Sequence, residues 1–478
     1  MGLSLIVIGF FIIFAIIYAL LIPAQLRQWS LFIASIILIY VLQPDIFVRW
    51  LDFFLPTLTL LLVTLTWHFT CAEKQKVSRK DWVSLIIIVM LVIGLSLLRY
   101  LDIDWRWFLP SRPPPIQLIL GVISLIGLIA IFMRQWSGRL SLLLVLFIAL
   151  FAILKTEPLA IWLSQNLRGF TNQDRSLAAA IDLNWLGFSY VAFRLIHTIR
   201  DRQSGLLPTL SLHEYVTYVI FFPSFIAGPI DRAERFIDDF RKLSDEVKFS
   251  DRYIRGFTRI MIGITKKFII ADTLAQGIAL NPINALQVDN ALGAWLLLYA
   301  YALRLFFDFS GYSDIAIGIG ILLGINLPEN FSQPYTRTSI TKFWQSWHIT
   351  LSNWVRFYVF SPLTRYLLKR KPKPSAILIV LITQLTTMIV IGIWHGVTVN
   401  FLVWGIWHGL GLFIHKQWSD RTRKFYRELK QKSRTYQMIA DGLAWIVTFH
   451  FVVLGWVWFA LPTFEQAVNL FIVLFGFV

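Results

Sequence analysis

Three histidines, each directly after a tryptophan, lie in the strongly apolar stretch between residues 341 and 416. Ionisable side chains at membrane depth are costly, so their presence there favours a functional site. A neutral imidazole has a pKa near working pH and can take a proton from a hydroxyl while that oxygen attacks an acyl carbon. The candidates for this chemistry are His348, His395 and His408.

His395 suits the role of proton acceptor. The next residue, Gly396, would let substrate or backbone approach closely, because glycine has no Cβ. The preceding residue, Trp394, would supply an apolar wall. These neighbours predict that the sequence around His395 lines a substrate tunnel.

His348 lies near Ser352 and Asn353, and it could orient the acceptor or hydrogen-bond a developing oxyanion. Each histidine taken alone is about as consistent with a structural role, because buried polar side chains usually find hydrogen-bond partners. The presence of three such histidines in one segment favours a functional site. Spacing does not rank them, and His408 is also open to a supporting or pore-lining role.

Other kinds of catalytic centre are disfavoured. No His-Glu-x-x-His string is present, and the spacing between His395 and His408 is not that of metal ligands. The single cysteine, Cys71, excludes an internal disulfide and a cysteine-based metal site. A serine nucleophile elbow is also missing. We therefore predict no catalytic metal and no bound cofactor.

The composition indicates a membrane protein that crosses the bilayer many times. Of 478 residues, 57% are hydrophobic and only 15% are charged, too few charges to cover a soluble domain of this size. The formal charge is +17, but the excess lies in short segments between apolar runs. That is the positive-inside pattern of a plasma-membrane protein, so we do not expect nucleic-acid binding.

Residues 1–176 read as N-terminal scaffold helices. The first apolar run lacks the features of a cleaved signal peptide and is expected to be retained. The connection that contains Lys74, Lys76, Arg79 and Lys80 is assigned to the cytoplasm by its charge. The six predicted spans are 2–22, 31–42, 47–67, 82–98, 116–133 and 140–163.

From residue 177 to 478 the apolar runs are interrupted by glycine, proline and charged residues, which is typical of a site rather than a scaffold. Residues 215–230 are too short and too broken for an ordinary span and read as a re-entrant segment. Residues 251–271 mix basic and apolar side chains, which suits an interfacial amphipathic helix on an anionic membrane face. In the run 291–325, Arg304 and Asp308 would share a helix face and neutralise each other, more simply as a structural ion pair than as catalytic groups.

Two further runs, 375–393 and 397–414, are flanked on their outer sides by basic loops, 365–373 and 416–434, which predicts a helical hairpin entered and left from the cytoplasm. His395 would then lie at or near its apex. Residues 443–461 form another span, followed by a short terminal run, 464–478. The expected fold is all-α, with about 11 to 13 transmembrane or re-entrant helices.

The chain resembles the membrane-bound O-acyltransferase (MBOAT) family, in particular its bacterial branch that modifies alginate and teichoic acids. The resemblance rests on strings that occur in this order: FFPSFIAGPIDRAERF (221–236), FFDFSGYSDIAIGIGILLGINLPENF (306–331), FWQSWHITLSNWVRFYVFSPL (343–363) and GIWHGVTVNFLVWGIWHGL (392–410).

The resemblance implies the MBOAT arrangement of helices and a tunnel through which an acyl group passes from a cytoplasmic thioester, acetyl-CoA or an acyl carrier, to an extracytoplasmic hydroxyl. It places the family's essential histidine on His395 and the assisting position on His348. The expected activity is acetylation of an exported polysaccharide, or of a partner acetyltransferase or export protein. D-alanyl transfer to a teichoic-acid-like polymer and transport without chemistry remain the alternatives.

Overall fold

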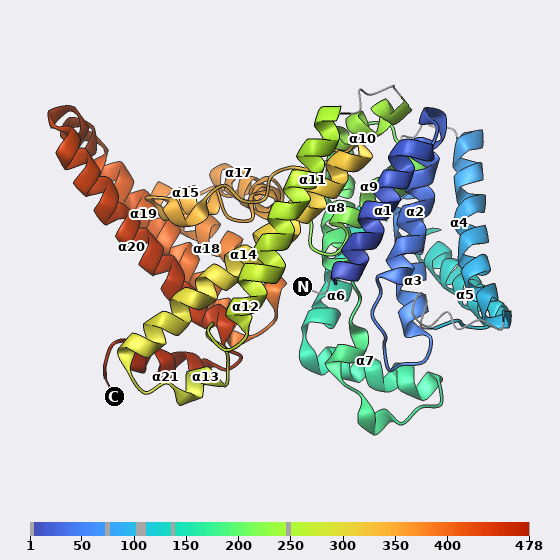
Figure 1. Ribbon diagram of the computed structural model, residues 1–478, viewed down its shortest axis with the longest axis horizontal. Helices are drawn as coiled ribbons and strands as arrows, with labels where there is room; N and C mark the ends of the chain where they lie inside the picture. Colours follow the sequence, from blue (N-terminus) through green and yellow to red (C-terminus); the bar gives the residue numbers. More distant parts are fainter. Residues whose placement is uncertain (1–3, 72–76, 102–110, 135–138, 245–249, 478) are drawn as a thin grey trace. The chain divides into compact units, whose positions relative to one another are not determined.

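The computed structural model describes residues 4–71, 77–101, 111–134, 139–244 and 250–477, and all regular structure in these ranges is helical (Figure 1). The chain forms two compact units, one of residues 259–315 and 328–478 and the other of residues 2–258 and 316–327. These units differ from the predicted division into 1–176 and 177–478, which separated scaffold from catalytic core and stays a prediction.

The first five predicted spans are helices. They are α1 (Leu5–Leu21), α2 (Arg27–Val41), α3 (Leu51–Thr70), α4 (Arg79–Leu97) and α5 (Pro115–Arg134). The triple proline before α5 stays non-helical until Pro115, as expected for residues that lack an N–H. The capping box of Ser78 and Asp81 begins α4. Lys74 and Lys76 of the basic connection lie outside the described residues.

The sixth predicted span, 140–163, is not one continuous helix. Two helices replace it, α6 (Arg139–Lys155) and α7 (Glu157–Phe170), and they are bent by 93° at their junction. Pro158 lies in the first turn of α7, where it cannot donate to the preceding turn, and Thr156 has an extended backbone. A hydropathy pattern does not register such a break, because both helices are apolar on either side of it.

The segment predicted to be re-entrant is short, irregular and buried. After α8 (Phe188–Gln203), the nine-residue α9 (Leu212–Ile220) ends in a single turn at Phe222–Ser224, and non-helical backbone runs on to α10 (Ala233–Arg241). Arg194 of α8, 1% exposed, donates to the carbonyls of Val219 (2.7 Å) and Ser224 (3.0 Å) and to the Ser224 hydroxyl (2.6 Å). Irregular backbone is tolerated in such a place when protein groups satisfy it. Its depth in a membrane stays a prediction.

Replacing Arg194 by Met should destabilise the protein strongly. The methionine keeps most of the apolar stem, but several buried acceptors lose their donor, at roughly 1–3 kcal/mol for each such group. We expect Arg194→Met to lower the thermal midpoint in detergent, measured by fluorescence-detected size exclusion, while Arg200→Met at the end of the same helix leaves it near wild type. Equal midpoints for the two variants would contradict this role.

The predicted amphipathic segment is helical, but two of its basic side chains face the protein and several of its apolar side chains are exposed. It forms α11 (Ser250–Ile264) and a π-helical turn (Thr265–Ala271). Arg259 and Lys266 both pair at 2.6 Å with Asp314 of α14 (Ala291–Leu323), while the apolar side chains of Ile254, Met261 and Ile269 are exposed. Arg259 and Lys266 therefore neutralise a buried acid of the protein instead of facing anionic lipid.

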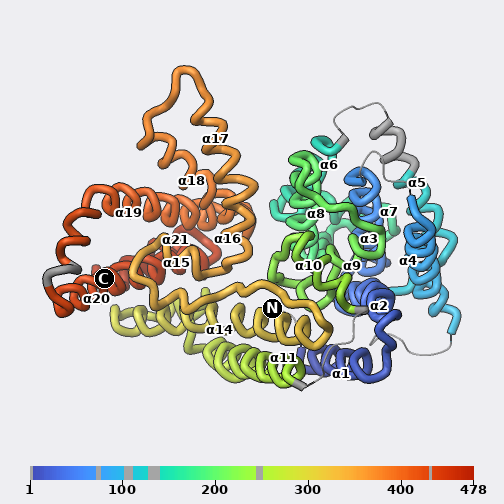
Figure 2. The backbone as a smooth tube through the Cα atoms, turned by 90° about the horizontal axis from the view of Figure 1, so that it is seen from above, coloured from blue at the N-terminus to red at the C-terminus, as the bar shows by residue number. Residues whose placement is uncertain are grey.

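The C-terminal part contains the predicted hairpin, α18 (Ala376–His395) and α19 (Val399–Lys432), and Figure 2 shows the two helices side by side. Glycines permit this close approach, since a Cβ on Gly405 would lie 2.7 Å from the Met388 carbonyl oxygen. The basic stretch after residue 414, expected to be a loop, continues as helix to Lys432, because lysine, arginine and glutamate favour helix.

The remaining helices are mostly short. They are α12 (Asp272–Ala275), α13 (Asn284–Gln287), α15 (Ile340–Trp344), α16 (Ile349–Val355), α17 (Ser361–Lys369), α20 (Arg434–Ala460) and α21 (Phe464–Leu474). Within the described residues, six helices are long and apolar enough to cross a membrane, or seven if α6 and α7 count as one. The predicted total of 11 to 13 also counted re-entrant and shorter elements.

Candidate active site

His395 is the last residue of α18 and lies at the apex of the hairpin, as predicted. Its partly exposed ring packs against Phe459 of α20 (centroids 4.7 Å apart), and against Trp404 (5.7 Å) and Phe401 (5.8 Å) of α19. The imidazole is therefore held in an aromatic setting where α18, α19 and α20 meet. Apolar walls of this kind strengthen electrostatic interactions with a reacting group.

His348 is 3% exposed and lies at the position before α16, in a left-handed backbone conformation (φ 43°, ψ 54°). A non-glycine residue with positive φ is unusual and indicates that its surroundings impose the conformation. Two chain segments are joined here, because the Ile349 N–H donates to the Asn330 carbonyl at 2.9 Å. Phe309 of α14 packs edge-on against the His348 ring at 4.6 Å.

Asn330 fixes the tautomer of His348. The Asn330 side-chain oxygen is 3.0 Å from His348 Nδ1 and also accepts from the Thr350 hydroxyl at 2.8 Å, while the Asn330 amide nitrogen donates to Ser313 at 3.2 Å. Since the oxygen is an acceptor, Nδ1 must carry the proton and Nε2 presents a lone pair. His348 Nε2 is buried and has no hydrogen-bond partner among the described residues.

The electrostatics keep His348 neutral. This residue lies between α15 and α16, outside the membrane-spanning helices, and burial lowers its pKa well below the usual value. The nearby His395 lowers it further. A neutral imidazole with an open Nε2 is the form that accepts a proton.

Trp394 brings the two histidines into one site. Its ring lies 6.2 Å from the His348 ring and 4.5 Å from the His395 ring, measured between centroids. The sequence-based expectation that Trp394 forms a wall therefore agrees with its position. Gly396 is also next to the site, but the group in close approach is the Phe401 ring, 2.8 Å from where a Cβ would stand.

Asn330 was not recognised as a site residue from the sequence, where it only marked a loop. Replacing it by Leu should leave the His348 ring free to rotate and to change tautomer, and we expect the rate to fall by about ten- to a hundredfold, as when ligand-orienting partners are removed. Asn330→Asp keeps an acceptor and should retain more activity, with a rate profile displaced to higher pH because a carboxylate favours protonated His348. Equal rates for the two variants and wild type would contradict the positioning role.

His408 lies one turn after Trp404 and is fully buried among aromatic rings. Trp404 (4.9 Å), Trp344 (5.2 Å) and Phe451 (5.8 Å) surround it, and neither ring nitrogen has a hydrogen-bond partner among the described residues. Replacing an unpaired buried polar group by an apolar one of similar size is often neutral or stabilising. We therefore expect His408→Leu to retain activity and thermal midpoint; loss of activity with unchanged folding would make His408 part of the chemistry.

The contacts described for the other predicted site residues do not involve the imidazole rings. Ser352 donates to the Trp347 carbonyl at 3.3 Å, and Asn353 is exposed. Asp308 pairs with Lys267 at 2.8 Å, and its predicted pairing with Arg304 stays a prediction. These contacts indicate structural roles for Ser352 and Asp308. Arg304 is half-buried on α14.

A charged cavity of about 510 Å³ is lined in part by Asn330. Its charged lining is paired: Arg259 and Lys266 contact Asp314, and Arg259 also contacts Glu329. Ser310 faces it with a buried hydroxyl that has no partner in the described part of the chain.

One cluster has the composition of a metal site. His197, Asp201 and Glu234 place one potential ligand atom each within 4.8 Å of one another. Arg232 donates to both Asp201 (3.1 Å) and Glu234 (3.2 Å), and His197 Nε2 lies 2.8 Å from Asp201. A guanidinium already supplies the positive charge that a cation would bring, so the cluster reads as an ion-pair network.

The long apolar helices define the class of protein, a multi-pass α-helical membrane protein. The chain belongs to the membrane-bound O-acyltransferase family, whose model matches residues 132–456. This confirms the family inferred from the sequence strings. The match includes both His348 and His395.

The chain is similar to several curated bacterial proteins. It is 35% identical over 293 residues to the probable alginate O-acetylase AlgI of Pseudomonas aeruginosa, covering 61% of this chain and 52% of the relative. It is 33% identical over 285 residues to the teichoic acid D-alanyltransferase of Bacillus subtilis, covering 59% and 70%. The peptidoglycan O-acetyltransferase of Helicobacter pylori is 34% identical over 256 residues, covering 54% and 45%. The chain thus spans about half the length of the alginate and peptidoglycan relatives.

Proposed function

We propose that this protein is a membrane O-acyltransferase that moves an acyl group, most simply acetyl, from a cytoplasmic thioester to hydroxyls on the extracytoplasmic side. The observation that carries the proposal is the environment of the His348 ring. This imidazole is buried and neutral, Asn330 sets its tautomer, and its Nε2 has no described hydrogen-bond partner beside Trp394 and His395. Family membership and the relatives named for polymer acylation support the same reaction class.

In the proposed reaction the acceptor oxygen attacks the thioester carbonyl carbon, and one of the two imidazoles takes the hydroxyl proton. The carbon–sulfur bond then breaks, and the proton passes to the departing thiolate, which leaves as a thiol. The second imidazole orients the acceptor or donates to the oxyanion. The products are an O-acyl ester and a free thiol, and the protein needs no bound cofactor for this step.

Two donors fit the proposal, acetyl-CoA and an acyl carrier protein. The acceptor is an exported polysaccharide or a partner acetyltransferase outside the cytoplasm, with D-alanyl transfer to a teichoic-acid-like polymer as the second candidate. The last part of α19, from Lys416 to Lys432, carries many basic residues, which would attract an acidic carrier. The positive-inside rule also explains these charges, so they do not choose between the donors.

Purified protein in proteoliposomes should be supplied separately with radiolabelled acetyl-CoA, acetyl carrier protein and D-alanyl carrier protein. The donor that transfers label to an alkali-labile ester in the acceptor fraction identifies the pathway. Passage of intact donor across the bilayer without ester formation would instead identify a transporter, and would overturn the proposed enzyme activity.

A further inference from the structure

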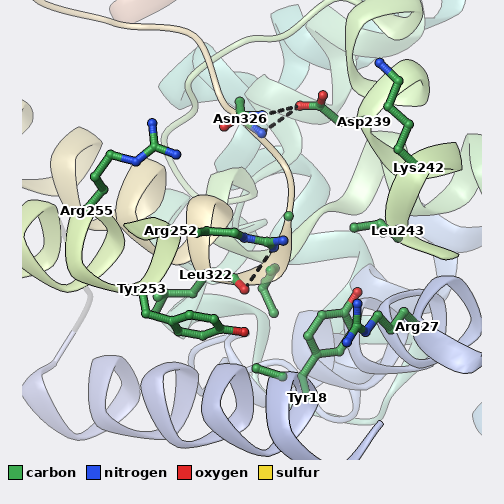
Figure 3. A pocket seen from close by; sticks show the side chains of 13 residues that line it. Tyr18, Arg27, Asp239, Lys242, Leu243, Arg252, Tyr253, Arg255, Leu322 and Asn326 are labelled. Carbon is green, nitrogen blue, oxygen red and sulfur yellow. Dashed lines mark hydrogen bonds between the residues drawn. The ribbon is translucent and has the colours of Figure 1, made fainter. Parts of the chain in front are cut away.

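A small basic pocket in the unit of residues 2–258 and 316–327 contains none of the site residues predicted from the sequence. Its volume is about 230 Å³, and Figure 3 shows its lining side chains. They come from the end of α1, the start of α2, the turn after α10, the first part of α11 and the chain around residue 324. Four cationic residues line it: Arg27, Lys242, Arg252 and Arg255.

Two polar groups of the pocket are buried without a partner. Tyr18 is 2% exposed, and its hydroxyl has no hydrogen-bond partner among the described residues. The Nε of Arg27 is likewise buried and unpaired. Figure 3 shows the Tyr18 hydroxyl and the Arg27 guanidinium together, facing the space toward which the Arg252 guanidinium is directed. Unpaired buried donors are costly, and a ligand with acceptor oxygens in this pocket would satisfy them.

The single acidic residue of the lining does not neutralise these cations. Asp239 accepts from the backbone N–H and the side-chain amide of Asn326, at 2.8 and 3.1 Å, and lies 3.9 Å from Arg235, which is not part of the lining. Arg252 is anchored by donating to the carbonyls of Ile321 and Leu322. The pocket therefore keeps a positive excess that is held in place before any ligand binds.

We propose that this pocket binds a phosphate group, and that the phosphate is carried by the headgroup of an anionic phospholipid. Tetrahedral phosphate oxygens match the donors of arginine and tyrosine, and arginine is suited to bidentate binding of phosphate. Apolar side chains next in sequence to the lining, Leu20 (63% exposed), Leu21 (72%) and Ile254 (66%), are placed to contact acyl chains.

The location of the pocket favours the lipid source over soluble phosphate. Arg27 begins α2 and Arg79 begins α4, and both helices start at the same end of this unit (Figure 1). That end carries Arg79 and Lys80, which belong to the connection predicted to be cytoplasmic by its charge. Anionic lipids give the cytoplasmic leaflet its negative surface potential and bind basic pockets between helices. A bound headgroup would tie α1 and α2 to α11 through their polar side chains.

Binding can be tested by native mass spectrometry on the full chain in neutral detergent, titrated with phosphatidylglycerol, phosphatidylcholine or inorganic phosphate. We expect one phosphatidylglycerol to bind in preference to phosphatidylcholine. Arg27→Gln should weaken it by about fivefold, the effect of one basic residue near an anionic surface. Tyr18→Phe, which removes only the hydroxyl, should weaken it by a smaller factor. Arg79→Gln loses the same charge outside the pocket and should bind as wild type.

The outcomes separate the sources of phosphate. If inorganic phosphate binds with the same dependence on Arg27 and displaces the lipid, the phosphate site is confirmed but its source is soluble. If phosphatidylglycerol and phosphatidylcholine bind equally, or if Arg27→Gln and Tyr18→Phe bind phosphatidylglycerol as wild type does, the proposal is overturned. Thermal midpoints of the variants without lipid show whether each one is folded.

Discussion

His395→Ala is expected to reduce acyl transfer by about a thousandfold, within the range that general acid–base groups contribute. The residue ends α18 at the apex of the hairpin, and its ring is set between Phe459, Trp404 and Phe401. Removing the imidazole removes one of the two groups proposed to take the proton or to orient the acceptor, but leaves the glycine-mediated contact of α18 with α19 in place. The rate should fall with little change in KM for the thioester.

The matched control for this variant is His408→Leu in the same hairpin. Both substitutions remove one histidine, but only His395 contacts Trp394 and the His348 site. Initial rates in proteoliposomes, normalised to folded protein, compare the two. A His395→Ala protein that keeps more than about a tenth of wild-type rate would remove His395 from the chemical step.

His348→Ala is expected to have an effect as large as that of His395→Ala. The alanine leaves Asn330 without its imidazole partner, and the buried lone pair at Nε2 is lost. If the two imidazoles act as one unit, the double variant should be no slower than either single variant, because coupled catalytic residues are strongly non-additive. Single-turnover rates of the three variants measure this coupling directly.

The pH dependence separates the roles of the two histidines. If His348 is the base, its low pKa keeps it neutral, so the rate should stay level as pH falls through the usual histidine range, provided that His395 is not the base. The control is Asn330→Asp, in which the acidic limb should move to higher pH. An acidic limb near the ordinary histidine pKa in wild type, unmoved by Asn330→Asp, would assign the base to His395 and the orienting role to His348.

The sequence was sufficient for the fold class, for most of the apolar helices and for the hairpin that carries His395. These features follow from hydropathy, helix length and the distribution of basic residues, which are local properties. The break between α6 and α7 was missed because a single proline near a helix start changes direction without changing hydropathy. The helical continuation of α19 after residue 414 was missed because a run of charged residues was interpreted as a loop.

The site was only partly accessible from the sequence. The tryptophan–histidine strings pointed to His348 and His395, but nothing in their spacing revealed Asn330, which lies on a separate loop and contacts His348 only in the folded chain. For the same reason the sequence did not reveal that Asp308 pairs with Lys267 on the preceding segment. Pairing between distant segments is a property of tertiary packing, which periodicity within one helix does not encode.

The most direct test of the proposed activity is to measure formation of the covalent acyl ester. Radiolabelled acetyl thioester is incubated with purified protein and an acceptor polymer, and ester-bound label is counted for wild type and for the double variant His348→Ala, His395→Ala. We expect label in the polymer for wild type and only background for the folded double variant. Ester formation at the wild-type rate by the double variant would contradict a catalytic histidine pair.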